Sequence, residues 1–221
     1  MLLRRSTANL LSVAIVVFHC SLLTAPLAAQ EKADLAKLAA QLKDKDAAVR
    51  RSAVESLGQL SDQSGVDLLI SALNDDNQEV RSAAALALGQ TGAAKGVEAL
   101  IKMLQSQSLR DRRSAIIALG TSGGDKACDA LIPLLKSTSA EDRDSVVAAI
   151  GGARCARAFE PLVKALADEH HMVRADAAMA LGDRRAIAPL ENLLKTEKNE
   201  NVRQQIEQAL VRLRAAPPEK K

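Results

Sequence analysis

The chain has 221 residues and a formal net charge of +3, and 48% of its residues are hydrophobic although only 1% are aromatic. An apolar interior built from Ala, Leu, Val and Ile suits closely packed helices, because Ala and Leu are strong helix formers. The near absence of aromatic side chains argues against enzyme pockets and nucleic-acid-binding surfaces, which usually recruit them for shape and stacking.

The first residues have the pattern of a secretory signal peptide. Arg4 and Arg5 precede a mostly apolar stretch at residues 10–23, and small residues at 25–29 provide a cleavage site. This order is typical of a segment that is removed on export. The apolar stretch is short for a membrane span, which needs about 20 residues. We therefore predict a signal peptide over residues 1–29, with an uncleaved signal anchor that tethers the protein to the membrane as the alternative.

Removal of this segment lowers the net charge from +3 to +1, because it contains two arginines and no acidic residue. A mature chain so close to neutrality does not favour nucleic acid or a membrane surface as a partner. We predict an exported protein, periplasmic or extracellular, with no nucleic-acid partner and no membrane insertion after cleavage.

Two cysteines, Cys128 and Cys155, remain after cleavage. In an oxidising compartment they could form a disulfide. The interpretation that we favour is a buried small thiol at Cys128 and a free thiol in a loop at Cys155.

A repeat with a period of 31 residues runs through the rest of the chain. A glycine follows an aliphatic residue once in each of five units: Gly58, Gly89, Gly120, Gly151 and Gly182. An arginine stands eight residues before each of these glycines: Arg50, Arg81, Arg112, Arg143 and Arg174. A sixth copy carries Arg203 without the glycine. Fixed self-similarity at this period is typical of a solenoid, in which each unit buries its apolar side against its neighbours.

Two helices are expected in each unit. The first helices are short and amphipathic, and they are predicted at residues 34–42, 66–73, 97–104, 128–135, 159–166 and 188–194. The second helices are predicted to begin after Asp46, Asn77, Ser108, Ser139, His170 and Asn199. All of these except His170 are preferred N-caps, because a short side-chain oxygen accepts a hydrogen bond from a free backbone N–H. The glycine near the end of each second helix is expected to let the chain turn, helped by Gly92 and Gly123. Pro133 is deep enough in its helix to bend it.

The pattern D-x-x-x-x-V-R-x-x-A-x-x-x-L-G, present at residues 44–58 and 75–89, resembles the short HEAT repeat of the phycobilin-lyase-like type. The resemblance covers residues 33–213. It implies an all-α fold, a right-handed α-solenoid of about five full units with end caps. Residues 214–221 are predicted to form a disordered tail.

In HEAT arrays the recurrent Asp and Arg form a hydrogen-bonded ladder between neighbouring units. The resemblance assigns this role to Asp44, Arg50, Asp75, Arg81, Arg112, Arg143, Asp168, Arg174 and Arg203, with Glu197 as the acid of the last unit. In the two middle units Ser106 and Ser137 replace the acid, and Asp111 and Asp142 stand directly before the arginine. These two carboxylates either restore the ladder by another route, which we favour, or mark a patch where a partner docks.

The resemblance leaves the question of catalysis open. Bilin lyases and a metal-dependent deoxyhypusine hydroxylase carry such repeats, as do many protein-binding scaffolds. The hydroxylase has His-Glu metal pairs in several units, whereas this chain offers only Glu169-His170-His171 in one unit. A metal site needs several converging ligands, so we favour a solvated helix start there. We predict a non-catalytic protein without a cofactor, and the alternative is an enzyme or enzyme accessory of the lyase or hydroxylase branch.

The second helices line the concave face in HEAT arrays, and two of their columns are candidate surface. One column reads Arg51, Ser82, Arg113, Asp144, Ala175 and Gln204, and the other reads Glu55, Leu86, Ile117, Ala148, Met179 and Gln208. An apolar strip flanked by mixed charge is typical of a groove for a peptide or a partner helix. We predict that a protein or peptide partner contacts Leu86, Arg113, Ile117, Asp144 and Met179. Two alternatives stay open, namely that the apolar strip packs between units and that the array is only a structural spacer.

Overall fold

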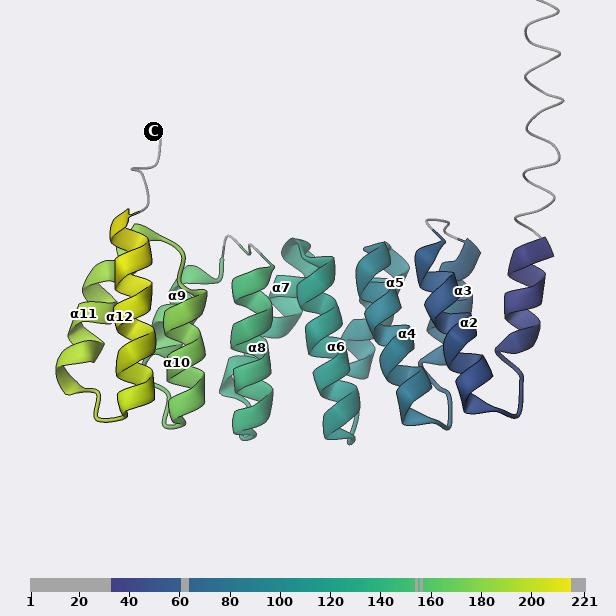
Figure 1. Cartoon of the computed structure of the whole chain (residues 1–221), viewed down its shortest axis with the longest axis horizontal. Coiled ribbons are helices and arrows are strands. Elements are labelled where there is room, and N and C mark those ends of the chain that lie inside the picture. Colours follow the sequence, from purple (N-terminus) through teal and green to yellow (C-terminus); the bar gives the residue numbers. More distant parts are fainter. Residues whose placement is uncertain (1–32, 61–63, 154, 156, 216–221) are drawn as a thin grey trace, which may run out of the picture.

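Antiparallel helix pairs succeed one another along the chain and form two parallel rows (Figure 1). The computed structural model describes residues 33–60, 64–153, 155 and 157–215, so the predicted signal peptide lies outside the described residues. The row of first helices comprises a helix at residues 33–41, α3 (Ser64–Ala72), α5 (Ala94–Met103), α7 (Gly124–Leu131), α9 (Phe159–Ala165) and α11 (Ile187–Thr196). The row of second helices comprises α2 (Ala47–Gln59), α4 (Gln78–Thr91), α6 (Leu109–Ser122), α8 (Ala140–Gly152), α10 (His171–Ala180) and α12 (Glu200–Ala215). The predicted all-α solenoid is confirmed.

Side-chain caps fix where the second helices begin. The Asp46 carboxylate accepts a hydrogen bond from the backbone N–H of Ala48 at 2.8 Å, and Asn77 and Ser108 cap α4 and α6 in the same way. The N-cap of α10 is His170, whose side chain makes no capping hydrogen bond. The six predicted starts therefore agree with the structure, including the one unit that lacks a capping side chain.

Proline interrupts one first helix. The α-helical part of α7 ends at Leu131, and the chain continues as a 3₁₀ helix, η1 (Ile132–Lys136), with Pro133 in its first turn. Proline has no backbone N–H to donate and its ring clashes with the preceding turn. A second short 3₁₀ segment, η2 (Arg184–Ala186), precedes α11.

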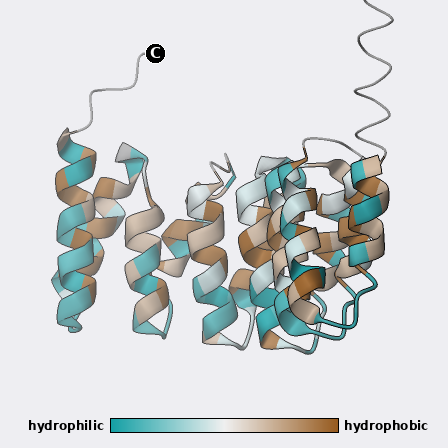
Figure 2. Ribbon diagram, turned by 45° about the vertical axis from the view of Figure 1, so that its right-hand side comes forward, coloured by the Kyte–Doolittle hydropathy of each residue, from teal (hydrophilic) through white to brown (hydrophobic). Residues whose placement is uncertain are grey.

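The hydrophobic core is one continuous layer between the two rows. It extends from Val54 to Leu213, and its largest fully buried side chains are leucines and isoleucines from nearly every unit. Within α4, Val80, Ala84 and Leu88 are all fully buried, one helical turn apart. The loops along the lower edge are hydrophilic (Figure 2).

Four of the five periodic glycines do not serve as turns, which corrects the expectation from the sequence for them, whereas Gly182 lies in the connection that follows α10. Gly58, Gly89, Gly120 and Gly151 lie within second helices. Positive φ angles occur at Gly92 and Gly123, as predicted for the turns, and at Gly124. A Cβ atom on Gly89 would lie 2.5 Å from the carbonyl oxygen of Ala118 and 2.8 Å from its Cα. The other three glycines face an alanine of the next second helix just as closely: Ala87, Ala149 and Ala180. Glycine is therefore needed because two backbones approach each other.

This close approach shapes the array. Neighbouring second helices such as α4 and α6 pack extensively, whereas the first helices α3 and α5 barely touch. The row of second helices is thus the shorter, concave side, and the row of first helices is splayed on the convex side.

At the carboxyl end, α12 continues through Arg214 and Ala215, two residues past the predicted end of the array, and residues 216–221 of the predicted tail lie outside the described part. Among the described residues, no helix combines the length and the apolar character that crossing a membrane requires.

Replacing Gly89 tests the close contact. We expect Gly89→Ala to lower the free energy of unfolding by about 1–3 kcal/mol, because the added methyl group overpacks a rigid backbone contact. Chemical denaturation measures this change. Gly152→Ala is the matched control, since a Cβ there meets nothing within 4 Å and alanine favours the helix. A Gly89→Ala protein as stable as this control would contradict the packing role.

Candidate functional site

Arginine and carboxylate side chains form a ladder through the loops between the two helices of each unit. Nε and Nη2 of Arg50 donate to the two carboxylate oxygens of Asp75 in the next unit, at 2.7 and 2.8 Å. Its Nη1 donates to the backbone carbonyl oxygens of Asp44 and Lys45, at 2.9 and 3.2 Å. One guanidinium therefore closes its own loop and holds the loop of its neighbour.

The ladder is continuous along the array. Five of the assigned arginines pair with a carboxylate of the following unit: Arg50 with Asp75, Arg81 with Asp111, Arg112 with Asp142, Arg143 with Asp168 and Arg174 with Glu197. The side chains of the first acid and the last arginine of the ladder form no ion pair within the ladder among the described residues, and they bond to backbone groups instead. Asp44 accepts a hydrogen bond from the backbone N–H of Asp46, and Arg203 donates to the carbonyl oxygens of Leu194 and Glu197.

In the middle units two side chains share the role of the missing acid. Asp111 lies in the first turn of α6 and accepts from Nε of Arg81 at 3.2 Å. The Ser106 hydroxyl accepts from the backbone N–H of Ser108 at 3.2 Å, as Asp75 does from Asn77. Asp142 and Ser137 repeat the arrangement. Both carboxylates are buried, so they belong to the ladder rather than to an exposed docking patch.

The ladder lowers the pKa values of its carboxyl groups at Glu197 and Asp168. Hydrogen bonds from Arg174, assisted by the backbone N–H of Asn199, lower the pKa of Glu197 to about 2 although burial acts in the opposite direction. Burial acts to raise the pKa of Asp168, but hydrogen bonds from Arg143 and from the backbone N–H of His170 outweigh it, so this pKa is also lowered. Glu197 and Asp168 are therefore held in the charged form.

A second row of ion pairs crosses the convex side and was missed in the sequence. Lysine or arginine at the start of one first helix pairs with an acid of the preceding one: Lys95 with Asp67, Lys126 with Glu98 and Arg157 with Asp129. The 31-residue spacing within each set was the available signal. These side chains are more than half exposed, so each pair contributes at most about 1 kcal/mol.

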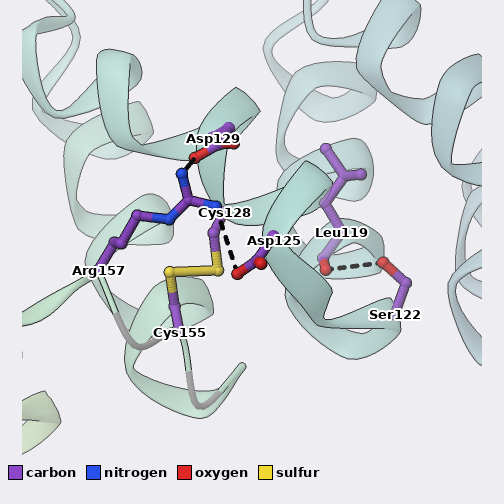
Figure 3. Close-up of a disulfide and its surroundings, with 7 residues drawn as sticks. All are labelled: Leu119, Ser122, Asp125, Cys128, Asp129, Cys155 and Arg157. Atoms are coloured by element: carbon purple, nitrogen blue, oxygen red, sulfur yellow. Dashed lines mark hydrogen bonds and ion pairs between the residues drawn. A yellow bond between two sulfur atoms is a disulfide. The ribbon is translucent and has the colours of Figure 1, made fainter.

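Cys128 and Cys155 are joined by a disulfide, which corrects the interpretation of two separate thiols. Cys128 is buried as expected, and the segment before α9 brings Cys155 to a Cα–Cα distance of 6.1 Å. This distance lies within the range of about 4.4–6.8 Å that disulfides need. Arg157 of the same segment pairs with Asp125 and Asp129 on α7 (Figure 3).

The five residues predicted to contact a partner lie on neighbouring second helices but differ in exposure. Leu86 on α4 and Ile117 on α6 are 42% and 43% exposed. Arg113 is also exposed, while Asp144 on α8 and Met179 on α10 are half-buried. For Leu86 and Ile117 the surface interpretation is therefore the one that the structure supports, whereas for Met179 the intermediate burial favours neither interpretation.

A groove of about 480 Å³ lies between α6 and α8 and brings together three of these residues, Arg113, Ile117 and Asp144. Its lining also includes small residues, namely Gly120, Ala148, Ala149 and Gly152. Leu86 and Met179 are not part of this lining. The groove thus offers an apolar middle with one basic and one acidic side chain.

Asp144, which lines the groove, has a second acidic side chain close to it, Asp176 on α10. Between α4 and α6, Ser114 donates a hydrogen bond to Ser82 at 3.0 Å, and Asp176 and Asp144 hold the equivalent positions on α10 and α8. Burial raises the pKa of Asp176, and the charge of Asp144 adds to the effect. Oδ1 of Asp144 is buried without a hydrogen-bond partner among the described residues. Acids whose pKa is shifted by burial and by a neighbouring charge are often found at functional sites.

Glu169, His170 and His171, at the start of α10, do not act together as one group. Glu169 pairs with Nη2 of Arg143 at 3.2 Å, whereas the rings of His170 and His171 lie 4.9 Å apart. Among the described residues, no three side chains of His, Cys, Asp or Glu are placed to hold a metal ion together.

The family model for HEAT repeats matches residues 35–120 and 128–211, and that for the PBS lyase HEAT-like repeat matches residues 111–137. No curated protein sequence matches the chain. A crystal structure of an engineered protein is 25% identical with a TM-score of 0.52, covering 82% of this chain and 97% of that one.

Two natural proteins of known structure are more distant. Human deoxyhypusine hydroxylase in complex with glycerol is 24% identical with a TM-score of 0.48, covering 82% of this chain and 85% of that one. A phycocyanin lyase complex from Nostoc sp. PCC7120 is 21% identical with a TM-score of 0.43, covering 80% and 93%.

Neutralising Glu197 tests the ladder. Because its folded pKa is about 2 and its ordinary value is 4.5, its charge stabilises the fold above pH 4.5, and this contribution is lost as the pH falls towards 2. We expect Glu197→Gln to lower the free energy of unfolding at pH 7 by about 1–3 kcal/mol. The deficit should shrink between pH 4.5 and pH 3. Glu200→Gln, an exposed neighbour, should change little, and a deficit independent of pH would contradict the assignment.

The paired acids should show the opposite behaviour. Since the pKa of Asp176 is raised, the folded state is less stable when both carboxyl groups are charged, so Asp176→Asn is expected to raise the melting temperature at pH 7. The gain should diminish as the pH falls and the wild-type pair takes up a proton. Asp144→Asn should give a similar gain, and the double variant should give less than the sum. Additive gains would show that the two carboxyl groups do not interact.

Proposed function

The chain belongs to the HEAT-repeat family, with repeats of the PBS-lyase-like type, and we propose that it is a non-catalytic scaffold of the cell envelope that binds a protein partner on its concave face. The observation that carries this proposal is the groove between α6 and α8. There Ile117 is 43% exposed between Arg113 and Asp144.

The physical basis is a rigid surface that is ready before the partner arrives. The second helices are fixed by backbone contacts at the glycines and by the ladder, so little conformational entropy opposes binding. An apolar side chain or the apolar face of a partner helix would cover Ile117 and, beyond the groove, Leu86. Arg113 and Asp144 on adjoining helices would orient the partner by charge.

Export of the protein is part of the proposal. The pattern of residues 1–29 supports it, and so does the disulfide between Cys128 and Cys155, because disulfides persist in oxidising compartments and are rare in the cytosol. The periplasm and the cell exterior both satisfy this condition.

Ile117→Asp tests the concave-face function. Wild-type and variant proteins are crosslinked to partners in the native envelope fraction and recovered. We expect a specific protein with the wild type that the variant loses, because a charged carboxylate would replace the apolar contact surface of Ile117 and binding would have to desolvate it. The variant should keep the wild-type melting temperature, since the side chain is exposed.

Val211→Asp is the matched control, because Val211 is 67% exposed on α12, outside this groove, and this variant should retain the partner. If wild type and Ile117→Asp recover the same proteins, the concave-face function is wrong. A stoichiometric metal or chromophore in the purified protein would then favour the lyase or hydroxylase branch.

A further inference from the structure

A cleft of about 960 Å³ opens on the convex side, between α3 and α5. It follows from the curvature of the array. Gly89 holds α4 against the backbone of Ala118 in α6, so the first helices of the same units are forced apart. In Figure 1 both α3 and α5 belong to the rear row, on the other side of the core from the exposed face of the second helices.

One part of the cleft wall is apolar. Ile70 and Leu73 come from α3 and the turn that follows it, and Ala99 and Met103 come from α5. All four side chains are half-buried. The wall therefore leaves aliphatic surface for a side chain of about the size of leucine to cover.

The acidic residues of the lining are already neutralised. Each of the four lies within an ion pair: Asp67 with Lys95, Asp75 with Arg50, Glu98 with Lys126 and Asp111 with Arg81. Because these carboxylates have their own cations, they do not make the cleft attractive to a further cation.

The basic residues are not fully used. Lys102 on α5 is exposed and forms no ion pair among the described residues, although its charge helps to lower the pKa of Glu98, which pairs with Lys126. Arg81 donates through Nε to Asp111 and through Nη1 to the backbone carbonyl oxygens of Asp75 and Asp76. Its Nη2 has no partner in the part of the chain that the structure describes.

The free Nη2 has a structural cause. In a standard step of the ladder the acid lies in the loop, and Arg50 uses both Nε and Nη2 on Asp75. Where the acid has moved into the helix, Asp111 receives Nε alone. The changed position of the acid therefore leaves Nη2 of Arg81, a residue of the cleft lining, without a hydrogen-bond acceptor among the described residues.

We infer that this cleft binds an acidic segment of a partner protein, with an aliphatic side chain against Ile70, Leu73 and Met103 and a carboxylate on Lys102 and Nη2 of Arg81. Hydrogen bonds between charged groups are the stronger ones and favour an anion at this place. The volume lies at the upper end of that found for ligand sites, which suits a peptide segment better than a small acid. Binding here is independent of the concave face, so the array could hold two partners at once.

The test uses two blocked tripeptides, Glu-Leu-Glu and Lys-Leu-Lys, added to protein with ¹³C-labelled methyl groups. NMR spectra should show saturable shifts of the Ile70, Leu73 and Met103 methyl signals with the acidic peptide only. Lys102→Glu should weaken this binding about tenfold or more, since it replaces an attraction by a repulsion.

Lys164→Glu is the matched control, because Lys164 is exposed at the equivalent position of α9 and does not line the cleft. It should leave binding unchanged, as should Ile117→Asp on the concave face. Equal shifts with the basic peptide, or unchanged affinity in Lys102→Glu, would overturn the inference. The inference would also be overturned if sodium acetate alone caused the same methyl shifts at the same concentration as the acidic peptide, because the site would then recognise only a simple anion.

Discussion

The architecture depends on how closely adjacent second helices approach one another. At Gly58, Gly89, Gly120 and Gly151 a second helix touches the backbone or Cβ of an alanine in the next one, with no room for a side chain between them. The first helices must accommodate larger side chains and diverge. This single asymmetry makes one side of the array concave and rigid, and it opens the cleft between α3 and α5 on the other.

The ladder also fixes the position of each unit relative to the next. Each of the five paired arginines contacts its own loop through one nitrogen and the neighbouring unit through another, as Arg50 does, so the unit-to-unit geometry is set by hydrogen bonds as well as by the core. These pairs are largely buried. Each charge is compensated by its partner, but the pairs add little net stability. The displaced acids at Asp111 and Asp142 show that the geometry can be kept while the donors of the arginine are redistributed.

Departures from the regular repeat are concentrated in the middle of the array. The groove beside Ile117, the facing carboxyl groups of Asp144 and Asp176, and the incompletely used Arg81 all lie between α3 and α10. None of these features improves the stability of a solenoid. Their position away from the two end units is consistent with a central binding region flanked by units that serve mainly to cap the core.

The sequence alone was sufficient for the repeat period, the all-α solenoid and the starts of the second helices, because helical periodicity and N-capping act over a few residues. It also identified the arginines of the ladder, and it placed Ile117 and Leu86 in a column that proved to be exposed. The role of four of the five periodic glycines was misjudged, since the same glycine suits a turn and a close helix contact equally well. The pairing of Cys128 with Cys155, the partners of Asp111 and Asp142, and the groove and cleft were decided only in the tertiary structure. They depend on distances between elements of different units, and such distances are set by how the units stack rather than by the local pattern of any one of them.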